Sequence, residues 1–115
     1  MKYEESNTQI ESVYWFKLAY PKKIIFHIPN GGYRNAIEGA RFKREGVLKG
    51  MIDLCIPEPN KSFHGLYVEL KAKKGKLSPE QKDLIAKLME RGYCVQTCHS
   101  FDEFKETVDE YFKLE

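Results

Sequence analysis

Residues 51–72, MIDLCIPEPNKSFHGLYVELKA, place two short apolar runs on either side of a loop that is rich in turn residues. The first run, MIDLCI, stops at a Pro-Glu-Pro segment, and the second, HGLYVELKA, is the strongest strand candidate in the chain. The two runs are typical of an antiparallel pair of strands. If the loop is centred near Lys61, Asp53 lies opposite Glu69.

The sequence on either side of this pair predicts alternating helices and strands. Pro21 ends the first helix, Ser78-Pro79-Glu80-Gln81 is a helix start with a capping box, and Gly92 closes that helix. The expected elements are a helix over 4–20, a strand over 24–28, a weakly amphipathic helical segment over 33–46, a helix over 79–91, a strand over 93–99 and a helix over 101–114. This order predicts one α/β domain over residues 1–115, with a mixed β-sheet flanked by helices.

Length and composition agree with an ordinary globular domain. The chain has 115 residues, of which 31% are charged and 42% are hydrophobic, so disorder, collagen and coiled coil are excluded. No apolar run approaches the roughly 18 residues of a membrane span. The N-terminus is polar and acidic, which is not typical of a secretory signal. We therefore expect a cytoplasmic protein without a membrane partner.

Cys55, Cys94 and Cys98 are the cysteines of the chain. An odd number without an export signal argues against a disulfide framework. The Cys94-x-x-x-Cys98-His99 spacing suggests zinc, but it falls in a predicted strand, where residues four apart are about 13 Å apart. Two sulfurs that far apart do not share one zinc ion at bonds of about 2.3 Å. Buried thiols are the better interpretation.

The net charge of +2 is unevenly distributed. Residues 41–76 carry nine basic and four acidic side chains, a net charge of +5, and residues 77–115 carry five basic and nine acidic side chains, a net charge of −4. A basic stretch in a nearly neutral protein is typical of a face that binds a polyanion. A solvated lysine-rich surface explains the charge alone equally well.

Asp53 and the Glu69-Leu70-Lys71 segment form the candidate site. Alternation along a strand points Glu69 and Lys71 to the same face, and facing side chains of paired strands start only about 5 Å apart at Cβ. Two carboxylates that close repel each other unless a proton or a cation lies between them. Mg²⁺ is usually held by one or two carboxylates together with water and phosphate. The alternative is a charged, exposed stripe with an ordinary ion pair.

A longer stretch, IPNGGYRNAIEGARFKREGVLKGMIDLCIPEP followed by HGLYVELKAKKGKLSPEQ, resembles the VRR-NUC (virus-type replication-repair nuclease) domain. This domain is a branch of the PD-(D/E)xK nuclease superfamily, and the resemblance runs from about Glu5 to Phe101. The proline of the superfamily's "PD" motif is absent, because Ile52 precedes Asp53. The matching pieces are Asn30-Gly31-Gly32 with Arg34, Gly39-Ala40-Arg41, Lys43-Arg44-Glu45-Gly46, Gly50 with Asp53, Glu69-Leu70-Lys71 and Ser78-Pro79-Glu80-Gln81.

The resemblance implies a restriction-endonuclease-like fold and hydrolysis of DNA phosphodiesters with Mg²⁺ or Mn²⁺. By the family pattern, Asp53 and Glu69 are metal ligands, the backbone carbonyl of Leu70 adds a ligand, and Lys71 is the catalytic lysine. Lys71 would position or deprotonate the attacking water, or stabilise charge on the phosphate. Gln81 is either a supporting catalytic residue or a capping-box residue. The residues expected to contact DNA are Asn30, Arg34, Arg41, Lys43, Arg44, Lys73, Lys74 and Lys76.

A glutamate of the first helix is also expected at the metal, and we choose Glu5. At 100° per residue, one stripe about 80° wide points toward the domain body; its members are Glu5, Gln9, Val13, Phe16 and Tyr20. Glu4 and Glu11 lie on another stripe. The alternative for Glu5 is a first-turn carboxylate that favours the helix dipole. The histidines, His27, His64 and His99, have no ligand spacing and are interpreted as structural.

The resemblance further implies a small nuclease of a bacterial or phage-infected cell, which resolves Holliday junctions or other branched DNA. A flap- or nick-directed nuclease and a non-catalytic DNA-binding module are the alternatives. One site cuts one phosphodiester at a time, so two cuts across a junction favour a symmetric homodimer. The expected contact surface is the first helix, through Tyr14 and Trp15, or the last helix, through Phe104, Tyr111 and Phe112. Alternatively, these aromatic rings cover the sheet of a monomer.

Overall fold

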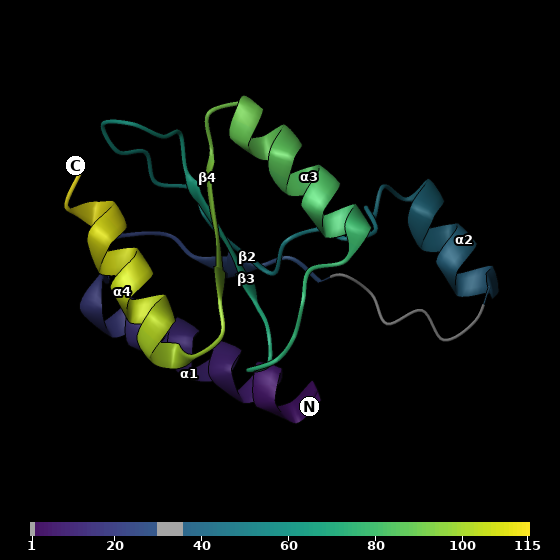
Figure 1. The fold of residues 1–115 in the computed structure, drawn as a ribbon, viewed down its shortest axis with the longest axis horizontal. Helices are drawn as coiled ribbons and strands as arrows, with labels where there is room; N and C mark the ends of the chain where they lie inside the picture. Colours follow the sequence, from purple (N-terminus) through teal and green to yellow (C-terminus); the bar gives the residue numbers. More distant parts are fainter. Residues whose placement is uncertain (1, 30–35) are drawn as a thin grey trace.

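A mixed sheet of four strands forms the centre of the computed structural model, which describes residues 2–29 and 36–115 (Figure 1). The strand order is β1-β2-β3-β4. The β1–β2 and β2–β3 pairs are antiparallel and the β3–β4 pair is parallel. The strands are β1 (Phe26–His27), β2 (Leu54–Ile56), β3 (Leu66–Leu70) and β4 (Cys94–Cys98).

The register of β2 against β3 confirms the pairing expected from the sequence. Leu54 lies opposite Val68, and Ile56 lies opposite Leu66. One step beyond the end of β2, this register places Asp53 opposite Glu69. The predicted mixed α/β fold is also correct, as is the order of its elements.

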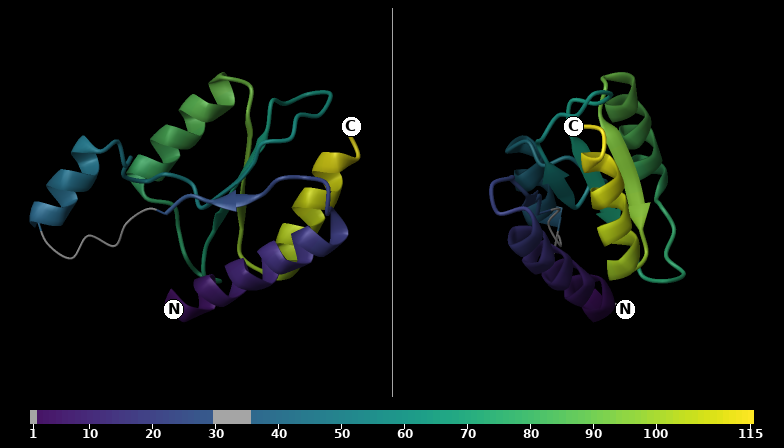
Figure 2. Two further views of the ribbon diagram at one scale, coloured as in Figure 1. Left: turned by 180° about the vertical axis from the view of Figure 1, so that it is seen from behind. Right: turned by 90° about the vertical axis from the view of Figure 1, so that its left-hand side faces the viewer.

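Helices cover both faces of the sheet. They are α1 (Lys2–Ala19), α2 (Ala36–Arg44), α3 (Pro79–Glu90) and α4 (Phe101–Phe112). Figure 2 shows α1 and α4 crossing each other at the end of the molecule that is far from α2. Leu70 packs in the core with α1 and α4, whereas the side chain of its neighbour Glu69 bonds to Gln81 of α3. Because neighbouring strand residues point to opposite faces, α3 covers the face opposite α1 and α4.

The hydrophobic core lies between the sheet and the α1–α4 pair. Its buried members include Phe16, Leu54, Ile56, Leu66, Val68, Leu70, Phe104, Val108, Tyr111 and Phe112. The idea that the aromatic rings of the last helix form a contact surface for a second copy is therefore wrong, because these rings cover the sheet. Trp15 is half-buried and packs edge-on against Phe101 and Phe104.

One stripe of α1 remains exposed. Ile10, Tyr14 and Leu18 are 65%, 67% and 66% exposed. Their spacing of four residues places them one above the other along the helix. This apolar stripe faces solvent, although the domain has its core on the other side of the same helix.

Several strands are shorter than the sequence predicts. The run over 24–28 pairs only at Phe26–His27, because the N–H of Ile24 donates to the Glu58 carboxylate, at 2.8 Å, instead of to a strand. MIDLCI forms a strand only over Leu54–Ile56, because the N–H of Asp53 donates to a side chain. In the segment predicted over 33–46, the described residues form the helix Ala36–Arg44, which buries no residue, as its weak amphipathic pattern suggests.

The cysteines are free thiols on the strands. Cys94 and Cys98 are the first and last residues of β4, as the strand interpretation requires. Cys98 is buried, as expected for this strand, but Cys94 is only half-buried; Cys55 on β2 is also buried. Among the described residues, no helix has both the length and the apolar character to cross a membrane.

Gly50 lets the chain that leads to Asp53 pass close to the start of α3. Its φ is +81°, a region that side chains other than glycine rarely adopt. A Cβ at this position would also lie 2.8 Å from Cβ of Glu80 and 3.0 Å from the nitrogen of Gln81. Gly46 has a φ of +100° with open space around it.

We predict that Gly50→Ala lowers the free energy of unfolding more than Gly46→Ala does. Each substitution lowers the free energy of unfolding by about 1 kcal/mol, because alanine is disfavoured in the left-handed backbone conformation. Only Gly50→Ala must also displace the first turn of α3, which adds about 1–3 kcal/mol. Urea unfolding of the two variants measures the difference. Equal losses would show that the contact with α3 is unimportant.

Candidate active site

Two hydrogen bonds cross between the strands at the Asp53 and Glu69 carboxylates. The N–H of Asp53 donates to Oε1 of Glu69 at 3.2 Å, and the N–H of Leu70 donates to Oδ2 of Asp53 at 2.9 Å. Each carboxylate therefore accepts a bond from the backbone of the opposite strand. Glu69 is only 3% exposed and Asp53 is half-buried. The backbone thus fixes both acidic groups in one small, poorly hydrated place.

Both carboxyl groups hold protons more tightly than they would in water. Burial, followed by the negative charge of Asp53, raises the pKa of Glu69 from 4.5 to about 7, although Lys71 acts in the opposite direction. Burial also raises the pKa of Asp53, against the lowering effects of the Leu70 N–H and of His27. The pair therefore favours a shared proton or a bound cation at neutral pH.

Gln81 bonds both to the cap of α3 and to Glu69. Its Oε1 accepts a bond from the N–H of Ser78 at 2.9 Å, which completes the capping box of α3. Its Nε2 donates to Oε2 of Glu69 at 2.7 Å. Because the amide oxygen must accept from the backbone, the amide nitrogen must face the carboxylate. The start of α3 thereby sets the orientation of Glu69.

Lys71 follows β3 and lies on the same side as Glu69. Its Nζ is 3.6 Å from Oε2 of Glu69, and its side chain is 17% exposed. A partly buried ammonium beside two carboxylates offsets one of their negative charges. It also leaves a proton donor next to the pair, where solvent has only limited access.

Glu5 reaches the end of β3 from α1. Its Oε2 accepts a bond from the N–H of Ala72 at 3.1 Å, and Oε2 of Glu4 accepts one from the N–H of Lys73 at 3.3 Å. Glu5 is half-buried, as its helical stripe predicts, whereas Glu4 and Glu11 are exposed. The charge of Glu5 also contributes to the raised pKa of Asp53.

His27 lies beside Asp53, which the sequence did not predict. Its Nδ1 is 2.9 Å from the carbonyl oxygen of Asp53. In β1 it pairs with Leu54, the residue that follows Asp53. No motif spacing links the two residues, so only the pairing of β1 with β2 could have identified the contact.

The expected DNA contacts fall on two exposed segments. Lys73, Lys74 and Lys76 are exposed on the segment between β3 and α3, and Arg41, Lys43 and Arg44 are exposed on α2. Figure 1 shows α2 at the end of the molecule near the start of α3 and far from α4. The exposed acidic residues of α4 are Asp102, Glu103, Glu106, Asp109 and Glu110. Asn30 and Arg34 lie outside the described residues.

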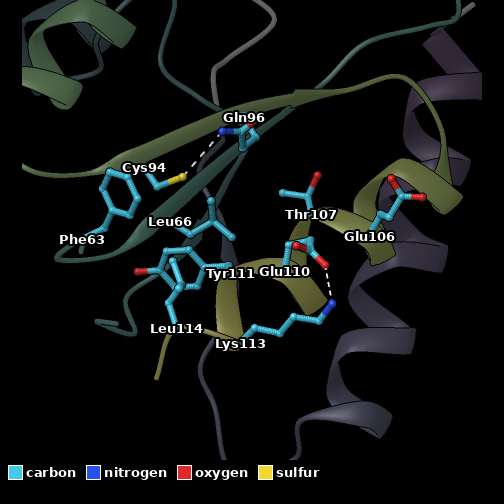
Figure 3. Close-up of a pocket in the computed structure, with 10 residues that line it drawn as sticks. All are labelled: Phe63, Leu66, Cys94, Gln96, Glu106, Thr107, Glu110, Tyr111, Lys113 and Leu114. Atoms are coloured by element: carbon cyan, nitrogen blue, oxygen red, sulfur yellow. Dashed lines mark hydrogen bonds and ion pairs between the residues drawn. The ribbon is translucent and has the colours of Figure 1, made fainter. Parts of the chain in front are cut away.

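A separate groove of about 550 Å³ lies between β4 and α4 (Figure 3). Apolar side chains such as Leu66 and Tyr111 line it, and the ion pair of Lys113 with Glu110 borders it. None of the candidate site residues contributes to this groove. The candidate chemistry therefore lies at the end of β3, outside this cavity.

The donors at the end of β3 suit a hard divalent cation. In residues 2–29 and 36–115, no group of three or more histidine, cysteine, aspartate or glutamate side chains is arranged to hold a metal ion. Mg²⁺ needs fewer protein ligands than that, because one or two carboxylates and water usually suffice before phosphate binds. Asp53 and Glu69 provide two such carboxylates, and their mutual repulsion favours a cation between them.

The chain matches one protein family in comparison with known proteins. The family described as the VRR-NUC domain matches residues 4–102. A solved structure titled "VRR_NUC domain protein" is 30% identical, with a TM-score of 0.81, over 96% of this chain and 89% of that chain. No curated protein matches.

We predict that the metal-free protein loses stability as the pH rises from about 4.5 to about 7, since the folded state binds the Glu69 proton more tightly than the unfolded chain does. The full shift corresponds to roughly 3 kcal/mol. Urea unfolding in EDTA measures this loss between pH 5 and pH 8. Glu69→Gln should flatten the profile, whereas exposed Glu106→Gln should not. Parallel profiles for wild type and Glu69→Gln would contradict the prediction.

Proposed function

The chain belongs to the VRR-NUC domain family, and from this membership we propose that it is a metal-dependent endonuclease that hydrolyses phosphodiester bonds in branched DNA. The observation that supports the proposal most strongly is the adjacent Asp53 and Glu69 carboxylates, of which Glu69 is buried, with Lys71 beside them. A non-catalytic DNA-binding module would have no need for two adjacent carboxylates that repel each other in a poorly hydrated place. We take residues 1–115 as one nuclease domain.

Asp53, Glu69 and the carbonyl of Leu70 would hold Mg²⁺ or Mn²⁺, with Glu5 completing the set. The bound ion would polarise the scissile phosphate and lower the pKa of a water molecule. Gln81 holds Oε2 of Glu69 in one orientation, so the carboxylate does not need to reorganise when DNA binds. Lys71 lies close enough to the pair to orient the attacking water or to stabilise negative charge on the phosphate.

The basic segments on either side of the site would hold the DNA backbone. Lysine and arginine contacts to phosphates fix the position of a duplex but carry no sequence information. We therefore propose that the protein selects DNA by shape. A four-way junction is the favoured substrate, and flaps and nicked duplexes are the alternatives within the same chemistry.

Lys71→Ala and Asp53→Asn should lower the cleavage rate by about 10²–10⁴-fold, because they remove the proposed catalytic lysine and a proposed metal ligand. Binding of DNA to these variants should remain close to that of wild type. The assay uses labelled four-way junction, flap and nicked duplex with Mg²⁺, Mn²⁺ or EDTA. Lys87→Ala and Asp83→Asn, an exposed ion pair on α3, are the matched controls. Cleavage in EDTA, or by Asp53→Asn at the wild-type rate, would refute the mechanism.

We also propose that the protein acts as a homodimer, because each chain offers one site and a junction needs two cuts. The exposed stripe of Ile10, Tyr14 and Leu18 on α1 is the proposed contact surface. Light scattering should give twice the chain mass of 13.5 kDa. Tyr14→Glu should give the single mass, while Lys17→Glu, exposed on the same helix, should not. Coordinated cutting of both strands by a protein of single mass would contradict the dimer.

A further inference from the structure

The carbonyl oxygen of Asp53 accepts two hydrogen bonds from β1. The N–H of Ile28 donates at 2.8 Å, and Nδ1 of His27 lies at 2.9 Å. A carbonyl oxygen only accepts, so Nδ1 must carry the hydrogen. The bond therefore selects one tautomer of the His27 ring, in which Nε2 is left without a hydrogen when the ring is neutral.

Packing does not explain this histidine. His27 is exposed, whereas the ring of His64 packs against Tyr93 and His99 pairs with Glu103. Among the described residues, the His27 ring forms its hydrogen bond with the carbonyl oxygen of Asp53. The His27 ring therefore forms a hydrogen bond with the backbone of Asp53 and contributes little to core packing.

Asp53 needs such support because β1 is short. The β1–β2 ladder consists of two residue pairs, Phe26 with Cys55 and His27 with Leu54. Beyond them, the bonds of Ile28 and His27 to the Asp53 carbonyl continue the pairing. From the opposite side, β3 holds Asp53 through the Leu70 N–H and Oε1 of Glu69. Asp53 is thus fixed between two strands, and the His27 bond is the side-chain part of the attachment to β1.

We propose that His27 is a positioning residue, whose bond to the Asp53 carbonyl holds the Asp53 carboxylate in place against Glu69 for metal binding. This inference rests on the proposed function, since it presumes that the Asp53–Glu69 pair binds a divalent cation. Without the ring, the peptide that follows Asp53 is held from β1 by one bond instead of two. The Asp53 carboxylate then samples more orientations. The cation binds more weakly, because binding must restrict the carboxylate to one of them. Partners that orient metal ligands in this way typically contribute about 10–100-fold in affinity or activity.

Substitution of His27 by asparagine or by glutamine distinguishes the roles of the two ring nitrogens. The side-chain nitrogen of asparagine occupies the place of Nδ1, and that of glutamine occupies the place of Nε2. His27→Asn should therefore keep the bond to the Asp53 carbonyl, and His27→Gln should lose it. His99→Ala is the matched control, because the contact found for the His99 ring is the one with the Glu103 carboxylate.

The experiment is calorimetric titration of the protein with Mn²⁺ in the absence of DNA. We expect His27→Ala and His27→Gln to bind Mn²⁺ about 10-fold more weakly than wild type, while His27→Asn and His99→Ala stay within about threefold. Wild-type affinity in His27→Ala would overturn the proposal. Rescue by glutamine but not by asparagine would also overturn it, because it would indicate a direct contact through Nε2. The melting temperature of each variant should stay within about 2 °C of wild type, as the ring is exposed.

Two further results separate this inference from the proposed function. If the wild-type protein fails to bind Mn²⁺, the proposed function fails and the role of His27 fails with it. If wild type binds Mn²⁺ and the variants do not follow the expected pattern, only the role of His27 fails. The ¹⁵N spectrum of the metal-free protein gives an independent check. It should show the hydrogen of the neutral His27 ring on Nδ1, and finding it on Nε2 would rule out the bond.

Discussion

Two carboxylates confined to the end of a strand pair are the constraint on which this structure depends. The register of β2 and β3 brings Asp53 and Glu69 together, and the backbone of each strand then bonds to the acid of the other. Such a pair is unfavourable in a protein interior, because burial and mutual repulsion both oppose its ionisation. The fold tolerates the pair because neighbouring groups provide hydrogen bonds or a positive charge for most of the carboxylate oxygens.

The groups that surround the pair come from several elements of the domain. Lys71 comes from the segment after β3, Gln81 from the first turn of α3, Glu5 from α1 and His27 from β1. A change in the position of any one element would therefore alter the site. Gly50 shows how closely the elements depend on each other, because its backbone contacts the same turn of α3 that orients Glu69.

Local patterns in the sequence predict much of this arrangement. Alternation along HGLYVELKA and the length of the loop after MIDLCI suffice to place Asp53 opposite Glu69, and the Ser78 motif predicts the capping box. Helical periodicity predicts the inward position of Glu5. The contact of His27 with Asp53 cannot be predicted in this way, because it depends on how β1 pairs with a distant strand. The burial of Phe104 and Phe112 likewise depends on which helix covers which face, and their apolar character alone does not decide it.

The distribution of charge between α2 and α4 has a consequence for how the protein would approach DNA under the proposed function. The basic residues of α2 and the exposed acidic residues of α4 lie at opposite ends of a molecule that is 44 Å long. Such a molecule has an electric dipole along its length, and the field of a polyanion exerts a torque on it. The protein would turn its basic end toward the duplex during diffusion, before any contact forms. This orientation weakens as salt shortens the Debye length to about 8 Å at physiological ionic strength. The rate of productive encounter would then fall with salt even for a substrate that binds equally well once docked.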